Sequence, residues 1–135
     1  MPMLNVNTNV PLDAVVISDI LKDASKAIAR LLSKPESKRN LAFPFDWIVY
    51  VMISIRHGVP MSMGGSEEPT AYAELISIGG LTPPNNKKIS AAISEILEKK
   101  ASIDPGRFYL KFTDVKEYTP ESQFSNVVCM HALHQ

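Results

Sequence analysis

The sequence predicts an α+β domain in which a four-stranded sheet carries two helices on one face. Two observations and one packing rule support this. The order strand, helix, strand occurs twice along the 135 residues. The two helices end in similar turns, Ser33–Glu36 in the first half and Ile103–Gly106 in the second. Two such βαβ pseudo-repeats can pair into one sheet with both helices on the same side.

The first half begins with a strand predicted over Met3–Asn9, where apolar and polar residues alternate. A helix follows, because apolar residues recur every three or four positions among charged ones. These residues are Val16, Ile20, Ala24, Ala27, Ile28, Leu31 and Leu32. The Lys34–Pro35 step ends the helix, since a residue before proline disfavours helical geometry. A Val/Ile-rich buried strand is predicted over Tyr50–Ile55.

The second half repeats this order. A strand is predicted over Ala71–Ile78 and closes at Gly79–Gly80. The loop Pro83–Asn86 offers an asparagine N-cap for an amphipathic helix around Ile89–Leu97. An alternating strand over Arg107–Thr113 completes the unit. The sheet face opposite the helices would be exposed and apolar, so we expect oligomerisation.

Two segments have no counterpart in this repeat. The segment 38–49 holds the only Trp and two of the five Phe, and we interpret it as an insertion. The tail 116–135 is poorly patterned, and Tyr118–Ser122 is typical of a loop. We therefore predict one domain over residues 1–135, with an insertion at 38–49 and an atypical tail at 116–135.

Composition excludes several classes of protein. Apolar residues make up 45% and charged residues 21%, which argues against both a membrane protein and a disordered chain. The 14 basic and 14 acidic residues give a net charge of +0, so no nucleic-acid partner is expected. A single cysteine and dispersed histidines predict no disulfide framework, metal or cofactor. The uncharged N-terminal segment predicts a cytoplasmic protein without a signal peptide.

Pro2 is the first candidate for chemistry. Removal of Met1 would leave a free N-terminal proline, which is a secondary amine. An apolar pocket lowers the pKa of such an amine because it disfavours the ammonium form, and this suits a general base at neutral pH. Position alone favours an ordinary strand start, because proline is common at the second position.

Several blocks of sequence together resemble one family. The stretch Pro2–Pro11 resembles the N-terminus of the macrophage migration inhibitory factor and D-dopachrome tautomerase family. Further blocks match in family order: Ser33-Lys34-Pro35, Met63–Pro69, Ser77-Ile78-Gly79 and Arg107–Leu110. The resemblance covers Pro2 to about Val115 without 38–49, and details such as Lys111 are most similar to the plant members. It implies a homotrimer with active sites between neighbouring subunits.

The resemblance also implies roles for single residues. Pro2 would be the general acid and base, and Lys34 the cation that holds the substrate carboxylate or oxyanion. The backbone N–H of Ile78 would bind substrate, and Tyr109 would reach the site from the adjacent subunit. Lys111 would favour anionic substrates. Without the resemblance, Lys34 is a helix C-terminal cation, Ile78 a buried strand residue, Tyr109 a packing residue and Lys111 a solvated lysine.

The implied activity is keto–enol tautomerisation of aromatic 2-keto acids such as phenylpyruvate, and of dopachrome, without a cofactor. The expected partners are the small-molecule substrate and two further copies of the chain, with no membrane. Two alternatives stay open. One is a cytokine-like binding or signalling protein with a protein receptor, acting outside cells by leaderless secretion. The other is a splice isoform whose insertion and tail reduce activity.

Overall fold

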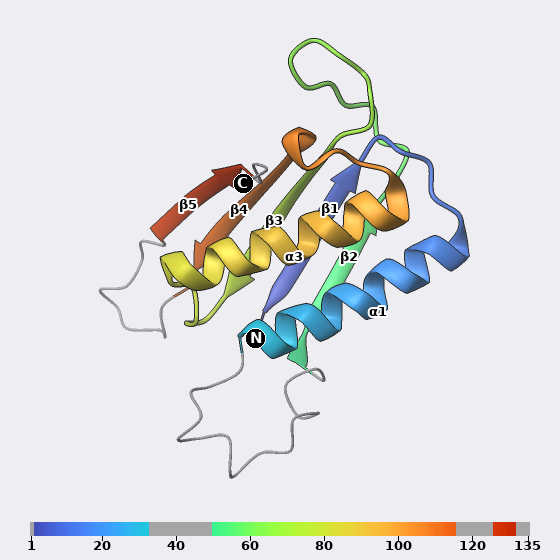
Figure 1. Cartoon of the computed structure of the whole chain (residues 1–135). Helices are drawn as coiled ribbons and strands as arrows, with labels where there is room; N and C mark the ends of the chain where they lie inside the picture. Colours follow the sequence, from blue (N-terminus) through green and yellow to red (C-terminus); the bar gives the residue numbers. More distant parts are fainter. Residues whose placement is uncertain (1, 33–49, 116–125, 132–135) are drawn as a thin grey trace.

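Five strands form one mixed sheet, and two long helices lie on the same face of it (Figure 1). The computed structural model describes residues 2–32, 50–115 and 126–131. The elements are β1 (Met3–Thr8), α1 (Ala14–Leu31), β2 (Met52–Arg56), β3 (Ala71–Ser77), α3 (Pro83–Ala101), the short 3-10 helix η2 (Pro105–Arg107), β4 (Phe108–Asp114) and β5 (Asn126–His131). The four predicted strands and both predicted helices are confirmed.

The strand order β2-β1-β3-β4-β5 shows how the two repeats combine. β1 is parallel to β2, and β3 is parallel to β4, so each pair with its crossover helix is one βαβ unit. The two units meet antiparallel at the centre of the sheet, where Met3 lies opposite Ile76. This pairing brings the start of β1 to the same sheet end as the C-terminal ends of β3 and β4.

The fifth strand corrects the prediction for the tail. Residues Asn126–His131 form β5, which pairs antiparallel with β4 and places Cys129 opposite Lys111. Val127 and Val128 favour a strand, but the segment lacks the alternation from which a strand is predicted. The predicted loop at 118–122 and the predicted insertion at 38–49 lie outside the described residues.

Side-chain caps set the start of both helices. Asp13 Oδ1 accepts the Val16 N–H at 2.8 Å and begins α1. Thr82 Oγ1 accepts the Asn85 N–H at 3.3 Å, with Pro83 in the first turn of α3. The predicted asparagine cap was therefore wrong. Threonine and asparagine both cap helices, and the proline at the first helical position favours the residue before it as the cap.

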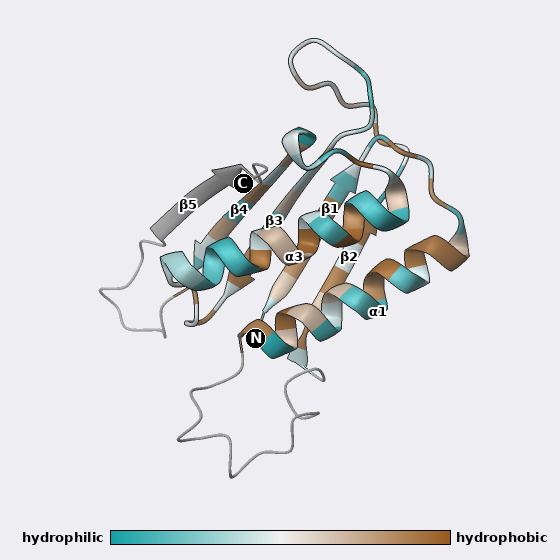
Figure 2. Cartoon of the chain, in the orientation of Figure 1, coloured by the Kyte–Doolittle hydropathy of each residue, from teal (hydrophilic) through white to brown (hydrophobic). Residues whose placement is uncertain are grey.

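The core lies between the helices and the sheet face that they cover. Apolar residues recur along α1 and along the strands (Figure 2). The largest fully buried side chains include Leu4, Ile20, Ile28, Leu75, Ile89, Ile93, Leu97, Phe108, Leu110 and Phe112. Burial of one such side chain contributes roughly 1.5–3 kcal/mol. This core fixes which residues of each strand face away from the helices.

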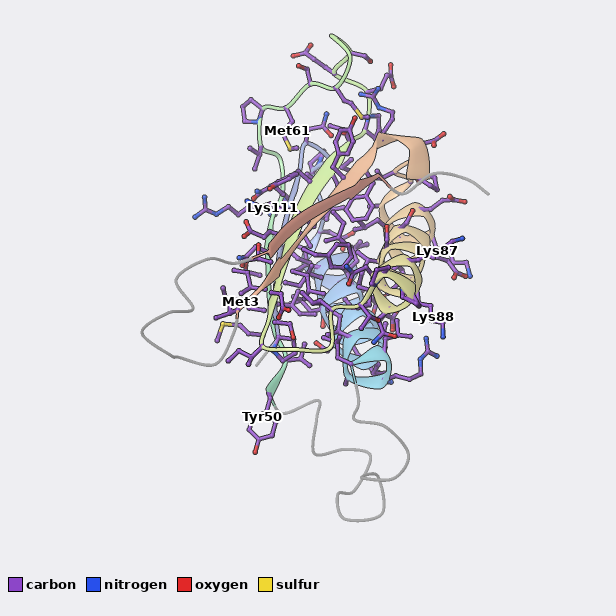
Figure 3. All side chains as sticks on the ribbon, turned by 90° about the vertical axis from the view of Figure 1, so that its left-hand side faces the viewer. Met3, Tyr50, Met61, Lys87, Lys88 and Lys111 are labelled. Carbon is purple, nitrogen blue, oxygen red and sulfur yellow. The ribbon has the colours of Figure 1, made fainter. Side chains whose placement is uncertain are left out.

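The face opposite the helices is more polar than predicted. Tyr72 and Tyr109 are exposed there, at 37% and 46%. However, the pairing also aligns four polar side chains in one row across this face: Ser54, Asn5, Glu74 and Lys111. Figure 3 shows Lys111 on the opposite side of the sheet from the α3 lysines. The prediction of an apolar face was wrong because the period of two assigns these polar positions to it.

Within the three described ranges, neither helix has both the length and the hydropathy that crossing a membrane requires.

Candidate functional site

Pro2 lies at the end of the sheet where β1 begins. Its side chain is buried, and its carbonyl accepts the Met52 N–H at 3.0 Å, which aligns β1 with β2. Since Met3 pairs with Ile76, the register places Pro2 opposite Ser77. Ile78 follows directly. The structure therefore brings Pro2 and Ile78, two of the predicted site residues, to one edge of the sheet.

The peptide group between Ser77 and Ile78 has a defined direction. The Ser77 carbonyl accepts the Val115 N–H at 2.9 Å, so it points toward the chain at the end of β4. A trans peptide directs its C=O and its N–H to opposite sides. The Ile78 N–H therefore points toward β1, where Pro2 lies. The Ile78 side chain is 51% exposed, so its interpretation as a buried strand residue was wrong.

Apolar side chains surround this edge. Of the large apolar residues that are exposed, Tyr50 and Met52 precede and begin β2, while Ile78 and Val115 follow β3 and β4. All four positions adjoin the Pro2 end of the sheet, and Figure 3 shows Tyr50 at this end together with Met3. Such a rim suits a ligand with an apolar or aromatic part.

Tyr109 and Lys111, which were also predicted for the site, lie away from this edge. Tyr109 pairs with Tyr72 and so lies level with Asn7, five positions along β1 from Pro2. At about 3.3 Å per residue this separation is roughly 16 Å. Lys111 lies level with Asn5, roughly 10 Å along the strand from Pro2 by the same measure. Lys34 lies outside the described residues.

In the part of the chain that the structure describes, no three His, Cys, Asp or Glu side chains gather as a metal site would require. Glu95 and Lys99 form an exposed ion pair in the C-terminal half of α3. The hydrogen bond from Lys99 Nζ to Glu95 Oε1, 2.6 Å long, lowers the pKa of Glu95 and raises that of Lys99.

Sequence reasoning missed Asp114, which holds the turn after Ile78. Asp114 Oδ1 accepts the Gly79 N–H at 3.1 Å, although the two residues are 35 positions apart. The Gly79–Gly80 pair directly after a strand marks a tight turn, but it does not indicate which residue supports that turn. Both glycines have positive φ, 75° and 80°.

The comparisons with known proteins agree with this architecture. A family model described as macrophage migration inhibitory factor (MIF) matches residues 1–123. A macrophage migration inhibitory factor homolog from Trichinella spiralis is 35% identical over 115 residues, covering 85% of this chain and 90% of that protein. The chain is thus a two-repeat α+β protein. It belongs to the macrophage migration inhibitory factor family.

Solved structures of family members share the fold. The homologue from Prochlorococcus marinus superposes with a TM-score of 0.71 at 33% identity, covering 84% of this chain and 89% of that one. The protein from Toxoplasma gondii also gives a TM-score of 0.71, at 29% identity, covering 92% and 99%. The two-repeat fold of this chain is therefore shared with these family members.

Proposed function

We propose that the chain is a keto–enol tautomerase that acts on aromatic 2-keto acids such as phenylpyruvate, and on dopachrome. One observation carries this proposal. A buried Pro2 lies at the same end of the sheet as an Ile78 N–H that is directed toward β1. The exposed apolar rim around this edge fits the aromatic part of such substrates. Family membership supports the same activity.

Pro2 is the proposed general acid and base. Removal of Met1 leaves its nitrogen as a secondary amine. A free α-amino group titrates near about 7.7–8.0, and burial lowers the pKa of an amine because desolvation penalises the ammonium form. The unprotonated amine is then available at neutral pH, which is the state that a general base requires.

The proton that Pro2 removes from the substrate returns to the same substrate molecule. The Pro2 nitrogen takes a proton from C3 of the 2-keto acid, and the electron pair of that C–H bond forms the C2=C3 double bond. The carbonyl oxygen receives the displaced electron pair and then takes the proton back from Pro2, which gives the enol. The Ile78 N–H donates to a substrate oxygen, where negative charge resides or develops.

Lys34 supplies the proposed cation. It follows Leu32 by two residues, and Leu32 Cδ2 lies 3.1 Å from the position of a Cβ built on Gly80, in the turn after Ile78. The end of α1 thus adjoins the Pro2 edge. A cation next to a developing oxyanion stabilises the transition state in a site that excludes water.

A homotrimer completes the proposed site. Tyr109 and Lys111 lie too far along the sheet to reach Pro2 of the same chain, so they would act at the Pro2 site of a neighbouring copy. The exposure of Tyr72 and Tyr109 on the open face supports such contacts. Light scattering coupled to size-exclusion chromatography measures the assembly directly, and a monomer would contradict this part of the proposal.

The test is phenylpyruvate turnover, with the intact mass of the same sample recorded to establish whether Met1 is absent. Pro2→Gly should lower kcat/KM by about 100-fold or more, as expected for loss of a positioned base. Pro11→Gly is the matched control, because Pro11 is exposed beyond the other end of β1. No turnover by protein that lacks Met1, or equal losses in both variants, would overturn the proposal.

A further inference from the structure

Three side chains from three elements hold the turn that follows Ile78. Asp114 Oδ1, at the end of β4, accepts the Gly79 N–H at 3.1 Å. Ser77 Oγ donates to the Gly79 carbonyl at 2.9 Å, and Asn85 Nδ2 of α3 donates to the Gly80 carbonyl at 2.9 Å. The turn is therefore fixed from β3, β4 and α3 together.

Asp114 and Val115 hold Ile78 from both sides. The Val115 N–H binds the carbonyl before Ile78, and the Asp114 carboxylate binds the amide after it. The first bond directs the Ile78 N–H toward β1, and the second keeps the following peptide group from rotating. Gly79 has a φ of 75°. Because glycine is conformationally permissive, it could adopt many other conformations without this support.

The register of β1 and β3 determines what the Ile78 N–H faces. The Asn9 N–H donates to the Thr70 carbonyl, which marks that pair as a hydrogen-bonded position of the β1–β3 ladder. Hydrogen-bonded positions recur every two residues, so Ile78 is the next such position on this strand after Ile76. Without Met1 the chain begins at Pro2, which the register places opposite Ser77 and not opposite Ile78. A correctly directed Ile78 N–H is then available for a substrate oxygen.

We propose that Asp114 is a positioning residue of the Pro2 site, which fixes the direction of the Ile78 N–H by holding the Gly79 amide. This inference rests on the proposed function. Asp114 acts through the turn and does not itself contact the substrate. Since a displacement near 1 Å can cost roughly 100-fold in rate, a loosened turn should lower turnover measurably.

The test compares Asp114→Ala, Asp114→Asn and Asp104→Ala. Asn keeps an oxygen acceptor and removes the charge, so the difference between Asn and Ala isolates the hydrogen bond. Asp104→Ala is the matched control, because Asp104 Oδ1 accepts the Gly106 N–H at 2.7 Å in the same kind of turn before β4. We expect Asp114→Ala to lower kcat/KM about tenfold, with Asp114→Asn within about threefold of the parent chain.

A second readout does not depend on turnover. Amide hydrogen exchange of Gly79, whose N–H Asp114 accepts, followed by NMR on the protein without Met1, should accelerate in Asp114→Ala and stay near the parent rate in Asp114→Asn and Asp104→Ala. If the parent chain lacks activity but shows this exchange pattern, the proposed function fails and the positioning role stands. Equal exchange in Asp114→Ala and Asp104→Ala, or equal loss of turnover in both, would overturn the positioning role.

Discussion

Gly80 packs against Leu32, the residue that follows α1. A Cβ built on Gly80 would lie 3.1 Å from Leu32 Cδ2, which is closer than most Cβ contacts. Gly80 also has a φ of 80°, in the region that disfavours residues with a Cβ. The turn after β3 and the end of α1 can approach this closely only because a glycine lies between them.

Gly80→Ala should therefore destabilise the chain through both strain and crowding. We expect about 2 kcal/mol, measured by urea unfolding. Gly65→Ala is the matched control, since Gly65 has a φ of 76° but nothing within 4 Å of its Cβ position. That variant should cost about 1 kcal/mol, the backbone part alone.

A double-mutant cycle separates the two parts. Leu32→Ala removes the atom that a Gly80 side chain would meet, so Gly80→Ala in that background should cost no more than Gly65→Ala. If the cost of Gly80→Ala does not fall in the Leu32→Ala background, crowding by Leu32 is not its source.

Arg107 holds the loop between β2 and β3 through hydrogen bonds to its backbone. Its guanidinium donates to four backbone carbonyls, those of Met63, Ser66, Glu68 and Pro69, at 3.4, 3.0, 3.1 and 3.0 Å. Arg107→Ala should lower the free energy of unfolding by about 2–3 kcal/mol, because several acceptors lose a charged donor. Arg107→Lys keeps the charge but not the planar group of donors, and should recover less than half of that loss. Full recovery in the lysine variant would show that charge, and not geometry, holds the loop.

The parts of the fold that sequence predicts are those with local signals. Alternation at Leu4 and Val6 predicts β1, and three-to-four periodicity predicts α1, because burial on one side selects these patterns. The register that places Met3 opposite Ile76 depends on packing between distant segments, so only the general arrangement could be predicted. β5 was missed because a short Val-Val segment at a sheet edge carries no periodic signal.

The candidate site could likewise be predicted only in part from the sequence. Pro2 and Ile78 stand in contiguous blocks that resemble the family, so they could be named from the sequence. Asp114 supports the turn through a bond across 35 positions, which no local pattern indicates. The polar row that includes Glu74 and Lys111 depends on the register of separate strands. The prediction of an apolar face therefore did not include it.

The N-cap of α3 gives a further prediction. Thr82→Ala removes the oxygen that accepts the Asn85 N–H and should cost about 1 kcal/mol in urea unfolding. Thr82→Ser keeps that acceptor and should stay within a few tenths of a kcal/mol of the parent chain. Equal losses in the two variants would assign the effect to the methyl group and not to the cap.

The exposed pair Glu95–Lys99 predicts a small, pH-dependent contribution to stability. Lys99 lowers the pKa of Glu95 in the folded chain, so the contribution is present above the ordinary glutamate pKa and is lost as pH falls through the lowered value. Glu95→Gln should therefore be slightly less stable than the parent chain at pH 7 and equal to it in strong acid. Because both side chains are exposed, 0.5 M salt should also reduce the difference in stability.

Glu67→Gln, in the exposed loop before β3, is the control for loss of one negative charge. A difference between Glu95→Gln and the parent chain that grows on acidification would contradict the assignment, since protonation removes the charge that Lys99 binds.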